Sequence, residues 1–274
     1  MTTPASERMV DLRVPSAAVG GAIEVTVVLP EDYGDTDEAF PTLYLLHGRG
    51  GDRHECLALA DDVDAVVAHG DMPPVIVVVP DAPWSLRASY YVDSRYGGSA
   101  TVPPGVAVET AFTTDLLGEI DGRFRTIPSR SGRTIGGYSM GGAGALRFVL
   151  AHPDLFAAAL VLSPAVYTPL PPDESTTRLF GAYGVDDRLF DADRFARLSY
   201  PAAVAAIDDA LPVRIFLAAG RDESAEEPSQ FRLLADTLST AEVLTDSRLL
   251  PGGHDWAVWH PAARGGLEWL NSSP

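Results

Sequence analysis

Short runs of branched apolar residues recur along this chain, separated by longer stretches in which apolar residues repeat with helical spacing. The runs predict eight strands, over residues 9–14, 23–29, 42–47, 75–80, 133–138, 159–163, 213–219 and 243–249. Such alternation is typical of a mostly parallel sheet with helices on both faces, because parallel strands need crossover connections and are buried on both sides. The first two runs meet at Gly20-Gly21, which predicts an antiparallel pair. We therefore expect an α/β fold on one eight-stranded sheet.

The stretches between the runs predict helices over residues 56–68, 108–124, 140–151, 229–238 and 262–270. No linker-like segment divides the 274 residues, so we expect one domain over residues 1–274. The one irregular stretch, residues 166–198, contains Thr168-Pro-Leu-Pro-Pro-Asp173. Long connections often serve as lids or binding loops, so this segment is expected either to line a pocket or to be a plain surface excursion.

The charge of the chain excludes several classes of partner. A net charge of −18 repels phosphate backbones and anionic headgroups, so neither nucleic acid nor a membrane surface is an expected partner. All 20 basic residues are arginine, and the lack of lysine excludes a P-loop, a Schiff base and a Ser-Lys dyad. Cys56 is the only cysteine, so no disulfide within the chain and no cysteine metal cluster can form. We expect no metal or cofactor. The charged first twenty residues and the absence of a long apolar run predict a cytoplasmic protein.

The pentapeptide Gly137-Tyr-Ser-Met-Gly141 matches the pattern G-x-S-x-G, with an apolar run before it and a helical stretch after it. In that context the serine stands on a sharp turn from strand to helix, where side chains at the flanking positions would collide. Glycine is therefore required on both sides of the serine, and Ser139 is predicted to be a nucleophile.

A serine hydroxyl needs a base to take its proton, and the base needs an acid to hold its tautomer. His254 lies in the loop Pro251-Gly-Gly-His-Asp-Trp256 after the last predicted strand, whereas His260 is expected at the start of the final helix, beside Pro261. The acid should follow the strand over residues 213–219, where Gly220-Arg-Asp-Glu223 supplies the first carboxylates. We predict a triad of Ser139, Asp222 and His254, with Glu223, Glu226 and Glu227 as the other candidates for the acid.

Catalysis of this kind also needs backbone N–H groups that bind a developing oxyanion. Met140 follows the nucleophile, and Arg49 lies in the glycine-rich segment that ends the strand over residues 42–47, so we assign the two donors to them. The aromatic residues Trp84, Tyr90, Tyr91 and Trp256 are predicted to bind substrate, with simple packing as the alternative.

With these residues identified, the chain resembles the putative-esterase family of α/β-hydrolases, which includes feruloyl esterases, S-formylglutathione hydrolases, siderophore esterases and mycolyltransferases. The likeness covers most of the chain and is most specific at the Ser139 pentapeptide and at Gly253-His-Asp-Trp256. It implies an α/β-hydrolase fold, the triad Ser139, Asp222 and His254, and oxyanion donors at Met140 and Arg49. Two departures, Tyr90 in place of the usual tryptophan and an insertion over residues 97–106, fall where the substrate should bind.

The expected activity is hydrolysis of small aryl or short-acyl carboxylic esters through an acyl-enzyme, with a small-molecule ester as the partner. Two other readings use the same residues. An acyltransferase would pass the acyl group to an alcohol or sugar, and a binding protein would use the hydrolase scaffold without catalysis.

Overall fold

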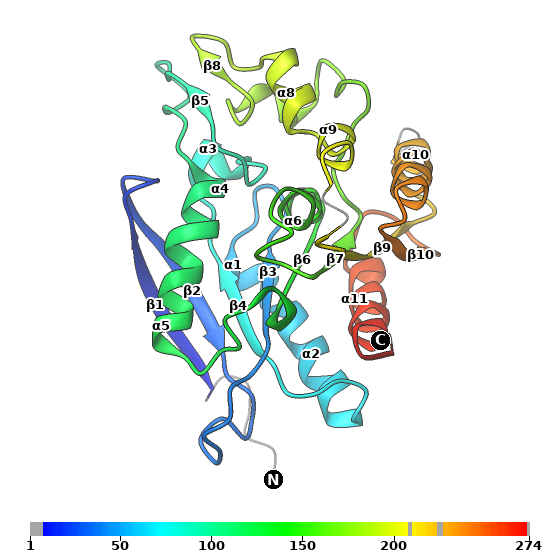
Figure 1. Cartoon of the computed structure of the whole chain (residues 1–274). Coiled ribbons are helices and arrows are strands. Elements are labelled where there is room, and N and C mark those ends of the chain that lie inside the picture. The colour runs from blue at the N-terminus through cyan, green and yellow to red at the C-terminus, as the bar shows by residue number, and fades with distance from the viewer. Residues whose placement is uncertain (1–7, 208–209, 224–226, 273–274) are drawn as a thin grey trace.

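The computed structural model describes residues 8–207, 210–223 and 227–272. Its centre is an eight-stranded sheet in the order β1-β2-β4-β3-β6-β7-β9-β10 (Figure 1). β1 pairs antiparallel with β2 and β2 with β4, and the other neighbours pair parallel. This confirms the mostly parallel α/β sheet and the hairpin at Gly20-Gly21. The strands are β1 Met9–Ser16, β2 Gly21–Val28, β3 Thr42–Leu46, β4 Ile76–Pro80, β6 Arg133–Tyr138, β7 Ala158–Leu162, β9 Arg214–Gly220 and β10 Leu244–Leu250.

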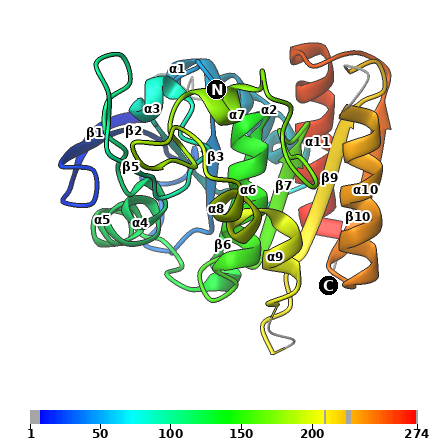
Figure 2. The same cartoon turned by 90° about the horizontal axis from the view of Figure 1, so that it is seen from above.

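Helices cover both faces of the sheet (Figure 2). On one face, α2 (Ala58–His69) and α11 (Trp256–Ser272) pack on a core that includes alternate residues of the strands. On the other face lie α4 (Val108–Thr110), the π-helical η2 (Ala111–Leu116), α5 (Leu117–Arg123), α6 (Met140–Ala151) and α10 (Glu227–Thr240). The expected helix over residues 108–124 is therefore three consecutive segments with a wider turn in the middle. No helix in the described ranges is long and apolar enough to cross a bilayer.

The final helix differs from its prediction. It begins at Trp256, so His260 and Pro261 lie inside it and not at its start. The side chain of Asp255 accepts a hydrogen bond from the backbone N–H of Ala257 at 2.9 Å, which is the contact of a helix N-cap. An aspartate cap satisfies one of the orphan donors of the first turn, and this stabilises a start ahead of the proline.

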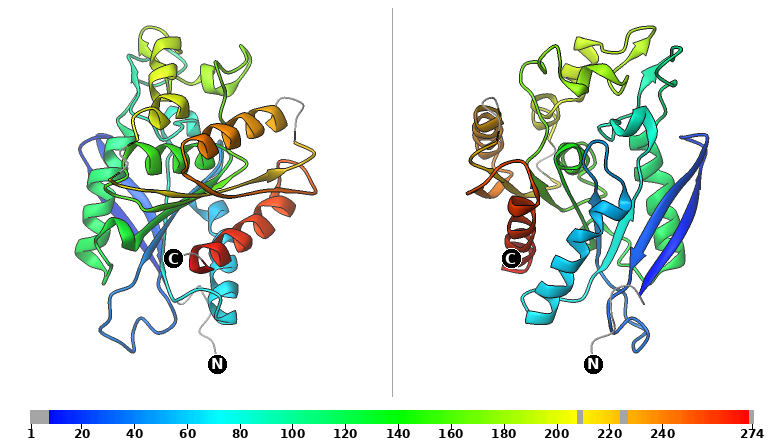
Figure 3. Two further views of the ribbon diagram at one scale, coloured as in Figure 1. Left: turned by 45° about the vertical axis from the view of Figure 1, so that its right-hand side comes forward. Right: turned by 180° about the vertical axis from the view of Figure 1, so that it is seen from behind.

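The segment over residues 166–198 contains more regular structure than expected. It forms α7 (Thr176–Leu179), β8 (Val185–Asp186) and α8 (Ala192–Leu198), and α9 (Tyr200–Val204) follows directly. β8 pairs with β5 (Arg95–Tyr96) in a separate two-stranded sheet. Figures 1 and 3 show β5, β8, α8 and α9 stacked beyond the carboxyl ends of the parallel strands, on the side where α3 (Trp84–Arg87) lies. The remaining short elements are α1 (Arg53–Cys56) and η3 (Arg130–Gly132).

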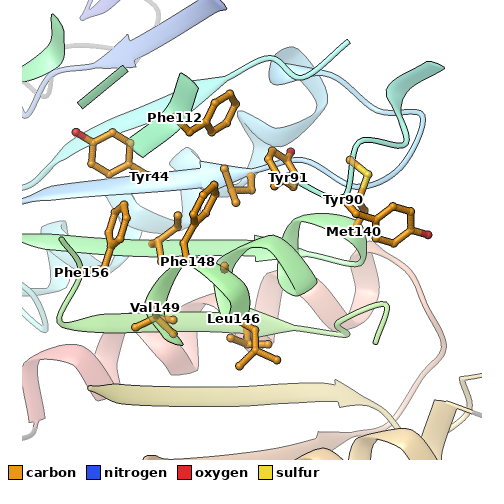
Figure 4. Close-up of a cluster of buried hydrophobic side chains, with 14 of the residues drawn as sticks. Tyr44, Tyr90, Tyr91, Phe112, Met140, Leu146, Phe148, Val149 and Phe156 are labelled. Carbon is orange, nitrogen blue, oxygen red and sulfur yellow. The ribbon is translucent and has the colours of Figure 1, made fainter. Parts of the chain in front are cut away.

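The core beneath α6 anchors the helix that follows the nucleophile (Figure 4). The rings of Phe112 and Phe148 stack with their centroids 6.3 Å apart, and Tyr91 meets Phe112 edge-on at 5.6 Å. Leu146 and Val149 of α6 are also fully buried. A buried aromatic or aliphatic side chain contributes about 1.5–3 kcal/mol, so α6 is held rigidly against the sheet.

Candidate active site

Ser139 stands on the turn between β6 and α6, with a φ of 56° and a ψ of −119°. A Cβ on Gly137 would lie 2.6 Å from the carbonyl carbon of Gly141, and a Cβ on Gly141 would lie 2.0 Å from the carbonyl oxygen of Leu46. Both glycines are therefore required sterically, as the pentapeptide indicated. The backbone of Ser139 is also held on both sides, since its N–H donates to Leu162 and its carbonyl accepts from Ala143 and Ala165. This fixes a strained conformation that few non-glycine residues adopt.

His254 lies across from the nucleophile, as predicted. Its Nε2 is 2.9 Å from the Oγ of Ser139, and about a third of the side chain, 32%, is exposed. The ring of Trp259 meets the imidazole edge-on, with the centroids 5.2 Å apart. One ring nitrogen of His254 therefore lies within hydrogen-bond distance of the serine hydroxyl, and the other points into the protein.

The carboxylate at the second nitrogen belongs to Glu223. Its Oε2 lies 3.1 Å from Nδ1 of His254, and only 4% of the glutamate side chain is exposed. A carboxylate can only accept, so Nδ1 carries the proton and Nε2 is left to accept the proton of Ser139. Burial would raise the pKa of Glu223, but hydrogen bonds from His254, Ser163 and the Gly220 N–H hold that pKa below its usual value. The acid is therefore ionised when the histidine is neutral.

The structure corrects the prediction that Asp222 is the partner of His254, because the carboxylate at Nδ1 belongs to Glu223. The backbone N–H of Asp222 donates to Gly252 at 2.9 Å, and its carboxylate accepts from the Gly252 N–H at 3.2 Å. These two hydrogen bonds of Asp222 hold the loop that carries His254, whereas the side chain of the next residue, Glu223, points to the imidazole. Of the other candidates, Glu226 and the side chain of Glu227 lie outside the described residues.

The two residues predicted to supply oxyanion donors lie near the turn of Ser139. Met140 is the first residue of α6, so its N–H has no acceptor within the helix and adds to the positive end of the helix dipole. Gly48, the residue before Arg49, is also close to the nucleophile, because a Cβ on Gly48 would lie 3.5 Å from the Cβ of Ser139. The structure thus brings the Gly48-Arg49 peptide and the Met140 N–H to the same serine.

Residues 81–91 form hydrogen bonds with the loop that contains Arg49. Nδ1 of His47 lies 2.8 Å from the Gly48 carbonyl oxygen, and its Nε2 accepts the Ala82 N–H at 3.0 Å. Arg87 accepts the Gly50 N–H on its carbonyl and donates from its guanidinium to the Gly51 carbonyl at 3.1 Å. His47 is therefore a structural residue of this loop.

The four predicted aromatic residues have different environments. Tyr91 is wholly buried and donates its hydroxyl to the His47 carbonyl at 3.0 Å, so it cannot touch a substrate. This corrects its assignment to the substrate site. Trp256 packs on Tyr138 with ring centroids 4.9 Å apart, beside the nucleophile strand. Trp84 begins α3 and packs, half-buried, against the core.

Tyr90 is the aromatic residue of this group that lines a cavity. The cavity lies between α6 and the segment over residues 165–203, and its volume is about 30 Å³. It borders the nucleophile turn, because the lining residues Ala143 and Ala165 both donate to the carbonyl of Ser139. Its aromatic lining is Tyr90, Tyr167, Tyr183, Phe195 and Tyr200.

Sequence reasoning missed several residues that the fold brings to the site. Tyr183 and Phe195 come from the stretch that was expected to be irregular and Tyr200 from just beyond it, and no local pattern ties them to Ser139. Ser163 contacts the acid and Trp259 contacts Ser163, but both lie far from Glu223 along the chain. The run Gly220-Arg-Asp-Glu223 did signal the right turn, though not which carboxylate faces His254.

Comparisons with known proteins identify the family of the chain. The model of the family described as "Putative esterase" matches residues 16–270. "Esterase Rv1288" of Mycobacterium tuberculosis is 30% identical over 270 residues, which is 88% of this chain and 54% of that protein. The chain therefore spans about half the length of this relative. "Acetyl esterase" of Caldicellulosiruptor saccharolyticus is 26% identical over 90% of this chain and 92% of its own length.

Solved structures show the same fold. A structure named as ferulic acid esterase superposes with a TM-score of 0.75 at 26% identity, over 96% of this chain and 97% of that one. An S-formylglutathione hydrolase from Agrobacterium tumefaciens superposes with a TM-score of 0.76 at 18% identity, over 96% and 94% of the two chains. At that identity the second likeness is evidence for the fold alone.

Proposed function

Because the chain belongs to the putative esterase family of α/β-hydrolases, we propose that it is a serine esterase that hydrolyses carboxylic esters through an acyl-enzyme. The observation that carries the proposal is the continuous series of contacts from Ser139 through His254 to the buried Glu223. A nucleophile, a base and an acid in that order are what acyl transfer to serine requires.

In the first half of the reaction, Oγ of Ser139 attacks the ester carbonyl while Nε2 of His254 takes the hydroxyl proton. Glu223 pairs with the imidazolium that forms, and the N–H groups of Met140 and Arg49 donate to the oxyanion. The imidazolium then gives its proton to the departing alcohol, which leaves the acyl group on Ser139. Water repeats the sequence, with His254 as its base, and releases the acid and free Ser139.

The size of the cavity beside Ser139 favours an ester with a short acyl group. A volume of about 30 Å³ holds one or two water molecules, so only a group as small as acetyl is expected to enter it. A hydroxycinnamoyl group would need the wall over residues 165–203 to move. Aryl groups are better placed on the alcohol side, toward the exposed face of His254. We therefore propose short-acyl esters, including aryl acetates, as the substrate class.

Labelling with a fluorophosphonate tests the nucleophile. The wild-type protein should be modified at Ser139, and Ser139→Ala should abolish labelling and lower turnover of p-nitrophenyl acetate by about 10⁶-fold. Ser131→Ala is the matched control, because Ser131 is an exposed serine just before the amino end of the same strand, β6. Labelling that persists in Ser139→Ala, or turnover within tenfold of wild type, would refute the proposal.

A panel of p-nitrophenyl esters from acetyl to palmitoyl, with methyl hydroxycinnamates and acetyl-CoA, tests the substrate class. Acetyl to butyryl esters should give the highest kcat/KM. A preference for chains beyond about ten carbons, or for the CoA thioester, would contradict the size argument.

A further inference from the structure

The hydrogen bonds of the acid continue beyond the three residues of the triad. Oε1 of Glu223 accepts from the hydroxyl of Ser163 at 2.6 Å and from the backbone N–H of Gly220 at 2.7 Å. The indole Nε1 of Trp259 lies 3.1 Å from the Ser163 hydroxyl oxygen. Ser163 and Trp259 are 3% and 7% exposed, so these contacts are largely shielded from bulk water. Trp259 also packs edge-on against His254, so the side chains of His254, Glu223, Ser163 and Trp259 each contact two others of the group.

The direction of each hydrogen bond is fixed by the chemistry of the two ends. An indole N–H can only donate and a carboxylate can only accept, so the Ser163 hydroxyl must receive from Trp259 and donate to Glu223. A hydroxyl that accepts one hydrogen bond becomes a stronger donor in the next. Two donors occupy Oε1, and Oε2 is thereby the oxygen that faces His254.

The position of Ser163 suits this task. It follows β7, which lies between the nucleophile strand β6 and the acid strand β9. Its φ is +42°, a conformation that non-glycine residues adopt at a cost of about 1 kcal/mol or more. A glutamate also has one more side-chain torsion than an aspartate, so its carboxylate needs additional contacts to stay in one orientation.

We propose that Ser163 is a positioning residue of the hydrolytic site, whose hydroxyl, polarised by Trp259, holds the Glu223 carboxylate in the orientation that serves His254. The inference rests on the proposed esterase function and adds two residues to it. Ser163 touches neither substrate nor the reacting atoms, and its effect passes through Glu223.

Steady-state hydrolysis of p-nitrophenyl acetate tests the proposal in Ser163→Ala and Trp259→Phe. Loss of one hydrogen bond to a charged group should lower kcat about 10- to 100-fold for Ser163→Ala, with KM changed less than about twofold. Trp259→Phe keeps a ring but removes the donor, so it should lower kcat in the same sense by a smaller factor. The proton NMR signal of the His254 Nδ1–H should shift in both variants.

The matched control is Thr126→Val. The Thr126 hydroxyl is also buried and donates to a carboxylate, that of Asp121, at 2.7 Å, but it lies before β6 at the opposite end of the sheet. This variant should lose comparable stability in urea without loss of kcat. In a Glu223→Gln background, Ser163→Ala should lower kcat no further, because its effect requires the carboxylate.

A wild-type kcat in folded Ser163→Ala, an unshifted Nδ1–H signal, or a full additional loss in the Glu223→Gln background would overturn the role of Ser163. If the wild-type protein itself neither hydrolyses esters nor reacts with a fluorophosphonate, the proposed function fails, and the inference fails with it.

Discussion

Replacing Glu223 by glutamine tests which carboxylate serves His254. Oε1 of Glu223 accepts from Ser163 and from the Gly220 N–H, so the amide oxygen of a glutamine should take that place. The amide NH₂ would then face Nδ1 of His254, which is 3.1 Å from Oε2 in the wild-type protein. Because NH₂ can only donate, Nδ1 must become an acceptor and the imidazole proton must lie on Nε2. A protonated Nε2 can no longer accept the proton of Ser139.

Two contributions set the expected loss. The carboxylate and the imidazolium of the transition state are unit charges about 4 Å apart, which at an effective dielectric constant of about 20 interact by about 4 kcal/mol. At about 1.4 kcal/mol for each factor of ten, this is about 10³ in rate. The wrong tautomer raises the expected loss in kcat to about 10⁴. KM should change little, since Glu223 lies behind His254 and is almost wholly buried.

The assay is steady-state hydrolysis of p-nitrophenyl acetate by Glu223→Gln, Glu223→Asp and Asp222→Asn. The hydrogen bonds of Asp222 described above join it to backbone atoms of Gly252, so Asp222→Asn should retain kcat within about tenfold. Glu223→Asp, which keeps the charge but shortens the side chain, should fall between the two. If Asp222→Asn is the severe change and Glu223→Gln is mild, the assignment of the acid is refuted.

Three further predictions concern pH and packing. Because the lowered pKa of Glu223 keeps it ionised, kcat/KM should rise with pH through one deprotonation, that of His254, and a two-proton slope would contradict this. Gly141→Ala should lower stability in urea by about 1–3 kcal/mol, whereas Gly118→Ala in α5, where a Cβ meets no atom within 4 Å, should raise it by up to about 1 kcal/mol. The pKa of Glu109 is lowered, despite burial, by His152 and Arg147, so its contribution to stability is present above about pH 4.3 and is lost as pH falls through the native pKa. Urea unfolding should therefore show Glu109→Gln about 3 kcal/mol less stable at pH 7, with a smaller deficit near pH 4.

The sequence by itself determined the sheet and the nucleophile turn, because both depend on neighbouring residues. Each apolar run became a strand within two residues of its expected bounds, since a strand buried on both faces must be apolar at nearly every position. The turn at Ser139 can be recognised from one pentapeptide, because a side chain on Gly137 would collide with the backbone of Gly141, four residues away.

Only the tertiary structure decided which residues complete the site. Asp222 and Glu223 are adjacent carboxylates that leave the chain in different directions, and nothing in their composition shows which one meets a histidine 31 residues later. Tyr90 and Tyr91 are likewise adjacent but have different environments. Tyr90 lines the cavity, and Tyr91 is buried under the loop of His47. Ser163 reaches Glu223 across 60 residues and Trp259 across 96, because the crossover connections of a parallel sheet bring the ends of β7, β9 and β10 to one edge. Contacts of that range depend on how strands and helices pack together, and the order of residues alone does not specify them.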